Sequence, residues 1–211
     1  MKKVLIIPSN TDLNRGDQAL VWESINLVED IFGKENVECS LMGDLKDKDV
    51  RYQNGQTEKL GYKFVDTLIK HPGRKYQSKH EDSKGYSKLT MIQWGWQAVK
   101  DYLHTIFLLS SFSIIRLFGE KFLSKSEMST LRTIKESDAI FVKGGGFIHS
   151  YGAVTDPYFI YYLTCNMRVA QAYGKKVFVL PNSVGPLKNS SAKKIALDAL
   201  NKCSFVSVRE N

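Results

Sequence analysis

The stretch FVKGGGFIHSYG, residues 141–152, joins an apolar run to three consecutive glycines and a histidine. Together with the preceding Ala139 and Ile140, the apolar residues have the length and composition of a short buried strand. Glycines in this position predict either a turn with positive φ or a backbone that a ligand approaches closely. Three in a row, followed a short loop later by the helix start Asp156-Pro157, favour the close approach of a ligand.

Alternating strand and helix patterns surround this stretch. Before it we expect a strand from Lys3 to Pro8, a helix at 17–32 and a strand from Val37 to Met42. After it we expect a helix from Asp156 to Gly174, a strand at 176–180, a helix at 190–202 and a strand at 205–208. Such alternation predicts an α/β fold with a Rossmann-like open parallel sheet and covering helices.

The region between the two alternating parts is different. Residues 43–90 are polar and carry both charges, which predicts a surface excursion with at most a short element at 62–70. A helical insertion is expected at 91–136, with helices at 91–118 and 126–136. Ser124 and Glu127 have capping-box spacing at the start of the second helix. We therefore expect residues 1–211 to form a single Rossmann-like domain with these two additions.

One apolar segment, HTIFLLSSFSIIRLFGEKFL at 104–123, raises the question of a membrane. It contains Arg116, and its longest uncharged run is shorter than the ~20 residues that a membrane-spanning helix needs. Apolar residues lie all round the helical wheel, which favours a buried or partner-covered helix. Peripheral contact of 104–123 with a membrane surface stays open as the alternative.

The composition limits the partners and the compartment. A net charge of +8 and a pI near 9.3 indicate anionic partners. The basic residues are spread along the chain without a nucleic-acid-binding signature, so nucleic acid is not an expected partner. Cys39, Cys165 and Cys203 have neither metal-ligand spacing nor an even number for disulfide pairing, so we predict no metal site and a reducing cytoplasm.

Four of the expected strands lead into segments of unusual composition. These segments are PSNTDLNRGD at 8–17, KGGGFIHSYG at 143–152, PNSVGP at 181–186 and SVREN at 207–211. In an open parallel sheet, ligands bind beyond the carboxyl ends of the strands, and parallel strands bring these ends to one edge. The resulting candidate site residues are Asn14, Gly16, Asp17, Gly144, Gly145, Gly146, His149, Asn182, Ser183 and Arg209.

Two interpretations are open for Asp17 and for His149. Asp17 either caps the helix that it opens or faces the crevice as a general base, with Asn14 orienting a hydroxyl group. His149 lies in a polar loop and is either structural or part of the site.

The later strand ends allow similar alternatives. Asn182 and Ser183 can hydrogen-bond either a ligand or their own loop. Arg209 either pairs with Glu210 on the surface or holds a carboxylate or phosphate at the edge of the crevice.

In the same order and with similar separations, NRGDQAL, KGGGFIH, PNSVGP and SVRE resemble the polysaccharide pyruvyl transferase family. The resemblance covers most of the chain except 43–130. It implies a two-domain fold like that of GT-B glycosyltransferases, with the active site in the cleft between two Rossmann-like halves. It also implies transfer of pyruvate from phosphoenolpyruvate to a sugar as a ketal, with release of phosphate, in cell-wall or exopolysaccharide biosynthesis.

The resemblance implies roles for the candidate residues. Asp17 and Asn14 would serve the acceptor sugar, whereas the glycines at 144–146, His149 and Arg209 would line the cleft near the donor. Phosphoenolpyruvate would be the donor substrate, with no further cofactor. Because the family's second domain is expected after SVREN, we expect this chain to be the acceptor-side half, either a truncated fragment or a natural half-protein, and to be inactive alone.

Two other functions remain compatible with the residues. The chain could be a GT-B-type glycosyltransferase domain that uses a nucleotide sugar, or a non-catalytic carbohydrate-binding module that retains the crevice. The expected location is the cytoplasm, either free or at the inner face of the membrane. The oligomeric state is not predicted.

Overall fold

The computed structural model describes residues 1–9, 12–45, 50–70 and 88–209. Its strands are β1 (Lys2–Ile7), β2 (Val37–Met42), β3 (Lys63–Val65), β4 (Ala139–Val142), β5 (Gly145–Ser150), β6 (Lys176–Leu187) and β7 (Phe205–Val208). Its helices are α1 (Arg15–Phe32), the 3-10 helix η1 (Lys34–Asn36), α2 (Val50–Glu58), α4 (Lys88–Ile106), α5 (Ser113–Glu120), α6 (Lys125–Glu136), α7 (Asp156–Ala172) and α8 (Ser190–Leu200).

The strands form one parallel sheet, as the alternation predicts. β1 lies between β2 and β4, and β3 extends the sheet beyond β2. β6 pairs with β4 along its first half and with β5 along its second half, whereas β7 lies on its other side. Asn182 of β6 is in register with Gly145 of β5 on one side and with Val208 of β7 on the other. The order β3-β2-β1-β4/β5-β6-β7 confirms a Rossmann-like open sheet whose strand order reverses between β1 and β4.

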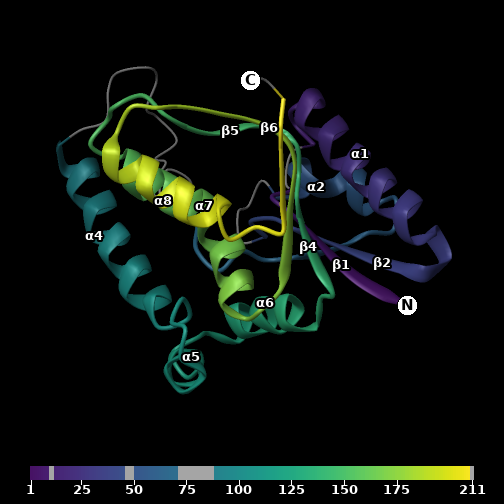
Figure 1. The fold of residues 1–211 in the computed structure, drawn as a ribbon, viewed down its shortest axis with the longest axis horizontal. Helices are drawn as coiled ribbons and strands as arrows, with labels where there is room; N and C mark the ends of the chain where they lie inside the picture. The colour runs from purple at the N-terminus through teal and green to yellow at the C-terminus, as the bar shows by residue number, and fades with distance from the viewer. Residues whose placement is uncertain (10–11, 46–49, 71–87, 210–211) are drawn as a thin grey trace.

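Helices cover both faces of this sheet (Figure 1). Val4 and Ile6 of β1 pack with Ile25 of α1 in one apolar cluster. The alternate residues Leu5 and Ile7 belong to a second cluster, which includes side chains of α6, α7 and α8. Because successive strand residues point to opposite faces, two covered faces require a continuously apolar strand. The run VLII in β1 and the run AIFV in β4 meet this requirement.

The structure differs from the expected secondary structure in several segments. The polar region 43–90 is not only a surface excursion, since it supplies α2 and the sheet strand β3, which lies within the short element expected at 62–70. The glycine run and PNSVGP are not loops beyond strand ends, because they belong to β5 and to the second half of β6. These two segments pair with each other beyond the end of β4. Their glycines, prolines and polar residues interrupt the apolar run that would mark a buried strand in the sequence.

The helix expected at 91–118 is also wrong, because the chain turns between α4 and α5. The Arg116 guanidinium stabilises this turn by donating to the carbonyl oxygens of Ser110 and Ser111 at 2.8 and 3.1 Å. Leu108 is fully buried beneath the turn, but Phe112 and Ile114 are 71% and 80% exposed. Segment 104–123 is therefore not a buried helix within this chain. No helix in the described part of the chain has the length and apolar character needed to cross a membrane.

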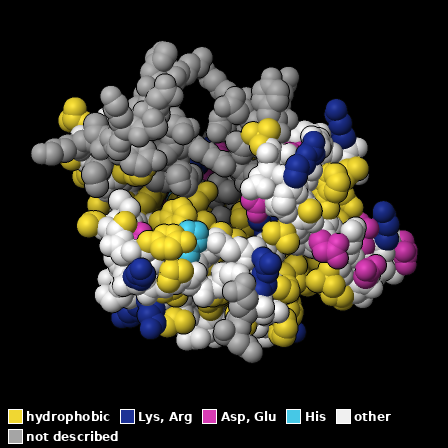
Figure 2. All heavy atoms as spheres, turned by 90° about the horizontal axis from the view of Figure 1, so that it is seen from above, with side chains coloured by type: hydrophobic (Ala, Val, Ile, Leu, Met, Phe, Trp, Pro, Cys, Tyr) yellow, Lys and Arg dark blue, Asp and Glu magenta, His cyan; other side chains and the backbone are white. Residues whose placement is uncertain are grey.

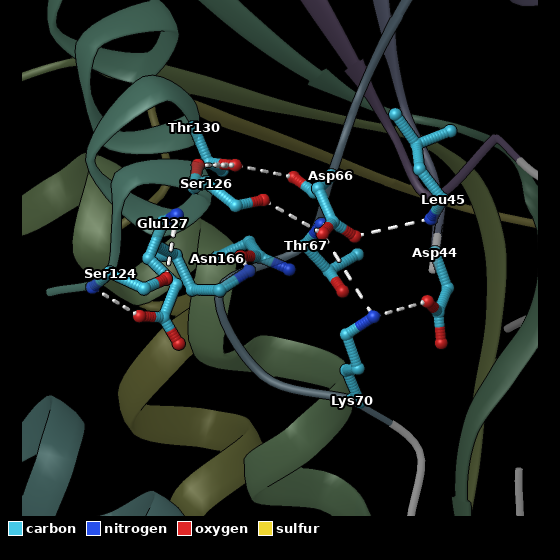
Figure 3. Close-up of polar contacts among 11 residues, drawn as sticks. Asp44, Leu45, Asp66, Thr67, Lys70, Ser124, Ser126, Glu127, Thr130 and Asn166 are labelled. Carbon is cyan, nitrogen blue, oxygen red and sulfur yellow. Dashed lines mark hydrogen bonds and ion pairs between the residues drawn. The ribbon is translucent and has the colours of Figure 1, made fainter. Parts of the chain in front are cut away.

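Asp66, at the end of β3, joins the sheet to α6 (Figure 3). One of its carboxylate oxygens accepts hydrogen bonds from the backbone N–H groups of Leu45 and Thr67 at 3.1 and 3.0 Å. The other accepts one from the Ser126 hydroxyl at 3.1 Å. The Thr130 hydroxyl also donates to the Asp66 carbonyl at 2.9 Å. These contacts fix the start of α6 against the edge of the sheet.

Glu127 and Ser124 form the predicted capping box at the start of α6. The Glu127 carboxylate also faces His104 of α4, with an N–O distance of 3.4 Å. Burial opposes ionisation of Glu127, but its contacts with His104 and Ser124 lower its pKa to about 2. The same contact raises the pKa of His104. Glu127 therefore links the capping of α6 to the position of α4.

Replacing Glu127 by glutamine retains a hydrogen-bond acceptor for the cap and removes the charge that faces His104. We expect Glu127→Gln to lower the free energy of unfolding by about 1 kcal/mol near neutral pH. Because the folded-state pKa is about 2 against an ordinary 4.5, the carboxylate contributes fully above pH 4.5 and progressively less as the pH falls toward 2. The difference from wild type in urea unfolding should shrink over that interval.

The raised pKa of His104 gives the opposite dependence at higher pH. Its contribution is complete below 6.5, its ordinary pKa, and is lost as the pH rises through the folded-state pKa. Glu23→Gln, at an exposed position on α1, is the control and should show neither dependence. A difference between Glu127→Gln and wild type that is independent of pH would contradict the assignment.

Candidate functional site

The candidate site lies at the carboxyl edge of the sheet, where the strand order reverses. β1 and β4 are neighbours there, and the Lys143 N–H continues their pairing by donating to the Ile7 carbonyl at 2.9 Å. Strands β4, β6 and β7 run toward this edge, where α1 also begins (Figure 1). In open parallel sheets this reversal leaves a crevice between the outgoing connections. The segments that follow β1 and β4 are therefore the walls of the candidate site.

α1 begins with Asn14 as its cap, which corrects one alternative for Asp17. The Asn14 side-chain oxygen accepts hydrogen bonds from the N–H groups of Gly16 and Asp17 at 3.1 and 3.3 Å. Asp17 is therefore not the cap, and its carboxylate lies in the first turn of the helix. Gly16 is exposed in the same turn. This geometry leaves the Asp17 side chain available for contacts outside its own helix.

Asp12 holds the segment between β1 and α1 in place. Its buried carboxylate accepts hydrogen bonds from the Gln18 side chain at 2.9 Å, from the Thr57 hydroxyl at 2.6 Å and from the Gln56 N–H at 2.8 Å. Burial opposes its ionisation, but these hydrogen bonds lower the pKa of Asp12 below its ordinary value. The carboxylate thus ties the start of α1 to α2, a contact across 45 residues of sequence.

Lys143 is the residue of the site that the sequence interpretation missed. Its side chain is only 4% exposed, and its ammonium group pairs with the Asp17 carboxylate, which is 37% exposed. The ammonium also lies 5.9 Å from the centroid of the Phe147 ring. A lysine that directly ends a fully buried apolar strand is the feature that could have identified it, because a buried ammonium requires a partner.

The three glycines have different surroundings. A Cβ at Gly144 would lie 2.9 Å from the Pro181 carbonyl oxygen, so the close backbone approach at this position is to β6. Gly145 has a φ of +147°, which side chains rarely allow. Gly146 is exposed, and the nearest atom to a Cβ there, in Ser183, would be 3.8 Å away. Gly146 is therefore the one exposed glycine of the three, and a Cβ there would make only an ordinary contact with Ser183.

Asn182 of β6 connects Gly145 of β5 to Arg209, which directly follows β7. Asn182 is in register with Gly145, and the Arg209 N–H donates to the Asn182 carbonyl at 3.1 Å. The buried Asn182 amide donates to the Lys143 and Leu180 carbonyls at 2.9 and 2.8 Å. Its side-chain oxygen is buried without a hydrogen-bond partner among the described residues. Arg209 is exposed at the end of β7, and Glu210, its alternative partner, lies outside the described residues.

His149 lies on β5 rather than in a loop. Its Nδ1 atom is 3.0 Å from the Gly146 carbonyl oxygen. Its ring packs against Tyr151 and Phe159, with centroid distances of 5.0 and 6.2 Å. His149 is thus held beside the exposed Gly146, on the same strand.

The structure brings most of the predicted residues into two connected groups. One group joins Asp17 to Lys143 and, through the Lys143 carbonyl, to Asn182. The other joins His149 to Gly146, which neighbours Ser183. Viewed onto this edge, the described surface carries scattered charges of both signs between apolar side chains (Figure 2). Contacts between His149 and Asp17 are not present in the described part of the chain.

A cavity of about 30 Å³ lies beneath the crevice, lined by Ile7, Val142, Phe147 and Thr67 among others. The Thr67 hydroxyl is buried without a hydrogen-bond partner among the described residues. This volume suits a water molecule and is far too small for a sugar. A sugar could therefore not bind in this cavity.

The fold and the site define an α/β protein with a candidate ligand site at the switch point of a parallel sheet. The chain matches the family model described as "Polysaccharide pyruvyl transferase" over residues 14–211. It belongs to this family, which implies a transferase that acts on a saccharide acceptor. The matched range includes 43–130, where the motifs of the sequence show no resemblance. Comparisons with curated proteins and with solved structures gave no match.

The ion pair predicts unequal effects of its two partners on stability. We expect Asp17→Asn to lower the free energy of unfolding by roughly 2 kcal/mol, because it leaves a buried ammonium without a carboxylate. Lys143→Met should cost less than about 1 kcal/mol, because water can solvate the partly exposed Asp17. The double variant should regain most of the loss in urea unfolding. Equal losses in both single variants would contradict this account.

Gly144 and Gly146 should differ in how well the fold tolerates an added methyl group, because Gly144 is crowded by a backbone oxygen and Gly146 is exposed. Gly144→Ala should lower the free energy of unfolding by about 2 kcal/mol, because the new Cβ would meet a backbone oxygen that cannot rotate away. Gly146→Ala, the matched control, should change it by less than about 0.5 kcal/mol. Thermal unfolding of both variants measures this difference in stability. A destabilised Gly146→Ala variant would show that Gly146 is not an uncrowded position.

Proposed function

We propose that the protein transfers the pyruvate skeleton of phosphoenolpyruvate to a saccharide as a cyclic ketal, in cell-wall or exopolysaccharide biosynthesis. The observation that carries the proposal is the family match over residues 14–211. The crevice at the switch point supports it with a carboxylate, a buried cation and an exposed glycine on neighbouring elements. The described chain would supply the acceptor side of the site and the residues that line the cleft near the donor.

The proposed reaction needs proton transfers and charge stabilisation. A proton is added to the methylene carbon of phosphoenolpyruvate, which becomes a methyl group and leaves C2 electrophilic. One acceptor hydroxyl attacks C2 and loses its proton, and the C2–O bond to phosphate breaks. A second hydroxyl then attacks C2, and its proton leaves with the phosphate. A general base must receive the hydroxyl protons, and cations or N–H groups must stabilise the phosphate and carboxylate.

Asp17 is the proposed general base for the acceptor. Its Oδ1 atom pairs with Lys143, which fixes the carboxylate at the crevice, and a sugar hydroxyl would be received at Oδ2. Asn14 caps the same helix through its side-chain oxygen, and its amide group is proposed to orient the hydroxyl. Lys143 is a positioning residue in this scheme, because its side chain is buried behind Asp17.

The donor is proposed to bind along β5 and the end of β7. Phosphoenolpyruvate carries a phosphate and a carboxylate, so its site requires donors of hydrogen bonds and positive charge. Gly146 is exposed and uncrowded, so it would allow close approach of the donor to the backbone. His149 beside it and the exposed Arg209 would supply polar contacts, together with Ser183. Asn182 would support the site from beneath, because its buried amide already donates to the Lys143 and Leu180 carbonyls.

The proposal requires no cofactor besides the donor substrate. We place the reaction in the cytoplasm, with the protein free or at the inner face of the membrane. Use of a nucleotide sugar, as in GT-B-type glycosyltransferases, and carbohydrate binding without catalysis are the competing functions.

Asp17→Asn should reduce pyruvyl transfer by the intact protein at least ~100-fold, because it removes the proposed base. The Asp17→Asn/Lys143→Met double variant should be equally inactive although its stability is largely restored, which separates catalysis from folding. Asp30→Asn, exposed on the same helix about 20 Å away, is the matched control and should retain activity. Phosphate release and ketal formation measure the reaction, and an active double variant would refute the role of Asp17.

Ligand binding distinguishes the competing functions. Phosphoenolpyruvate should raise the melting temperature of the intact protein, and Arg209→Gln should reduce that shift without changing the melting temperature of the free protein. Stabilisation by nucleotide sugars but not by phosphoenolpyruvate would favour the glycosyltransferase. Binding of saccharide with no turnover and no effect of phosphoenolpyruvate would favour a non-catalytic module.

A further inference from the structure

Helix α4 has its polar side packed inward and its apolar side exposed. Gln97, Asp101 and Thr105 are buried at intervals of four residues. Asp101 accepts hydrogen bonds from Gln97 and from Tyr158 of α7, each at 2.5 Å, and Thr105 contacts the Tyr161 hydroxyl. In a surface helix of a soluble protein the apolar stripe normally faces the core. α4 has the reverse orientation.

The opposite side of α4 is an exposed apolar stripe. It consists of Leu89, Ile92, Trp96, Val99, Leu103 and Ile106, which recur at intervals of three and four residues. Trp96 is 62% exposed and Leu103 is 59% exposed. A helix of 19 residues is about 28 Å long, so the stripe is a surface rather than a point contact. Contiguous apolar surfaces of this size mark interaction sites.

The turn and α5 extend the stripe with further exposed apolar side chains. Phe112, Ile114 and Leu117 are all exposed. α5 packs tightly against the turn, because a Cβ at Gly119 would lie 2.7 Å from the Phe107 Cβ. We call this surface, from α4 through α5, the apolar arm. It lies at the periphery, on the far side of α7 and α8 from α1 (Figure 1).

On the apolar arm the positively charged side chains named here are exposed, whereas the carboxylates pack against the rest of the protein. Lys100 and Lys121 are exposed, with the Lys100 ammonium 5.5 Å from the centroid of the Trp96 ring. The carboxylates are turned inward. Asp101 is buried against α7, and Glu120 pairs with Lys135 at 3.1 Å and accepts a hydrogen bond from Tyr173. The solvent therefore meets apolar and cationic groups here, on a chain whose net charge is +8.

We propose that the apolar arm docks the protein on an anionic lipid bilayer, with α4 and α5 lying in the interface rather than crossing it. Aliphatic and aromatic side chains would enter the headgroup–acyl boundary, and Lys100 and Lys121 would contact the lipid phosphates. A second copy of the chain is the weaker occupant, because it would bring the lysines of two identical arms together. The proposal is independent of the transfer reaction.

Vesicle binding tests the proposal directly. The intact protein should float with vesicles of phosphatidylcholine and phosphatidylglycerol, and much less with pure phosphatidylcholine. The variant Ile92→Ser/Val99→Ser/Leu103→Ser should bind at least ~10-fold more weakly. The matched control Ile31→Ser/Leu60→Ser/Leu197→Ser removes three exposed apolar side chains elsewhere and should bind like wild type. Lys100→Gln/Lys121→Gln should weaken binding to the anionic vesicles roughly 30-fold.

Fluorescence provides a local readout. In a Trp22→Phe/Trp94→Phe variant, the remaining exposed Trp96 should show a blue-shifted emission when anionic vesicles are added. No vesicle binding, or equal binding by the stripe variant and its control, would overturn the proposal. Self-association that is abolished by the stripe variant, without vesicle binding, would also overturn it and assign the apolar arm to an interface between copies. Pyruvyl transfer to a soluble acceptor should be the same in the stripe variant and in wild type.

Discussion

A buried ammonium group at the reversal of the strand order is the constraint on which the crevice depends. Lys143 directly follows β4 with a side chain that is 4% exposed, and an ammonium group buried to this extent is costly without a paired charge. Asp17 supplies that carboxylate from the first turn of α1. The position of α1 depends in turn on the Asn14 cap and on the Asp12 hydrogen bonds to α2. The ion pair thus holds the segment after β1 against the glycine run after β4.

The glycine run combines a structural and a proposed functional role in adjacent residues. Gly144 leaves room for the Pro181 carbonyl of β6, and Gly145 adopts a positive φ as β5 begins. These two positions let the chain bend from β4 into β5 while it keeps its pairing with β6. Of the three glycines, Gly146 alone is exposed. The wall of the crevice is therefore a strand, which positions its side chains more rigidly than a loop would.

The crevice and the apolar arm share α7 as a common support. α7 follows β5 along the chain, and its residues Tyr158 and Tyr161 hold the polar side of α4. Phe159 of the same helix packs against His149. A contact made by the apolar arm is thus only one helix away from the proposed donor side. The inverted orientation of α4 is stable because each of its buried polar groups named here has a partner on α7 or within α4.

Local patterns in the sequence were enough to predict the parallel α/β sheet, the capping box at Ser124 and the edge of the sheet to which the candidate segments lead, because buried strands and helix starts leave such patterns. The pairing of β5 with β6, the partner of Lys143 and the inverted orientation of α4 depend on long-range packing and became visible only in the folded chain. Strand pairing after the glycines has no apolar period, and the ion pair joins residues 17 and 143, which are far apart in the chain. Helical periodicity predicts an apolar stripe, but only packing against α7 determines which side of the helix is buried.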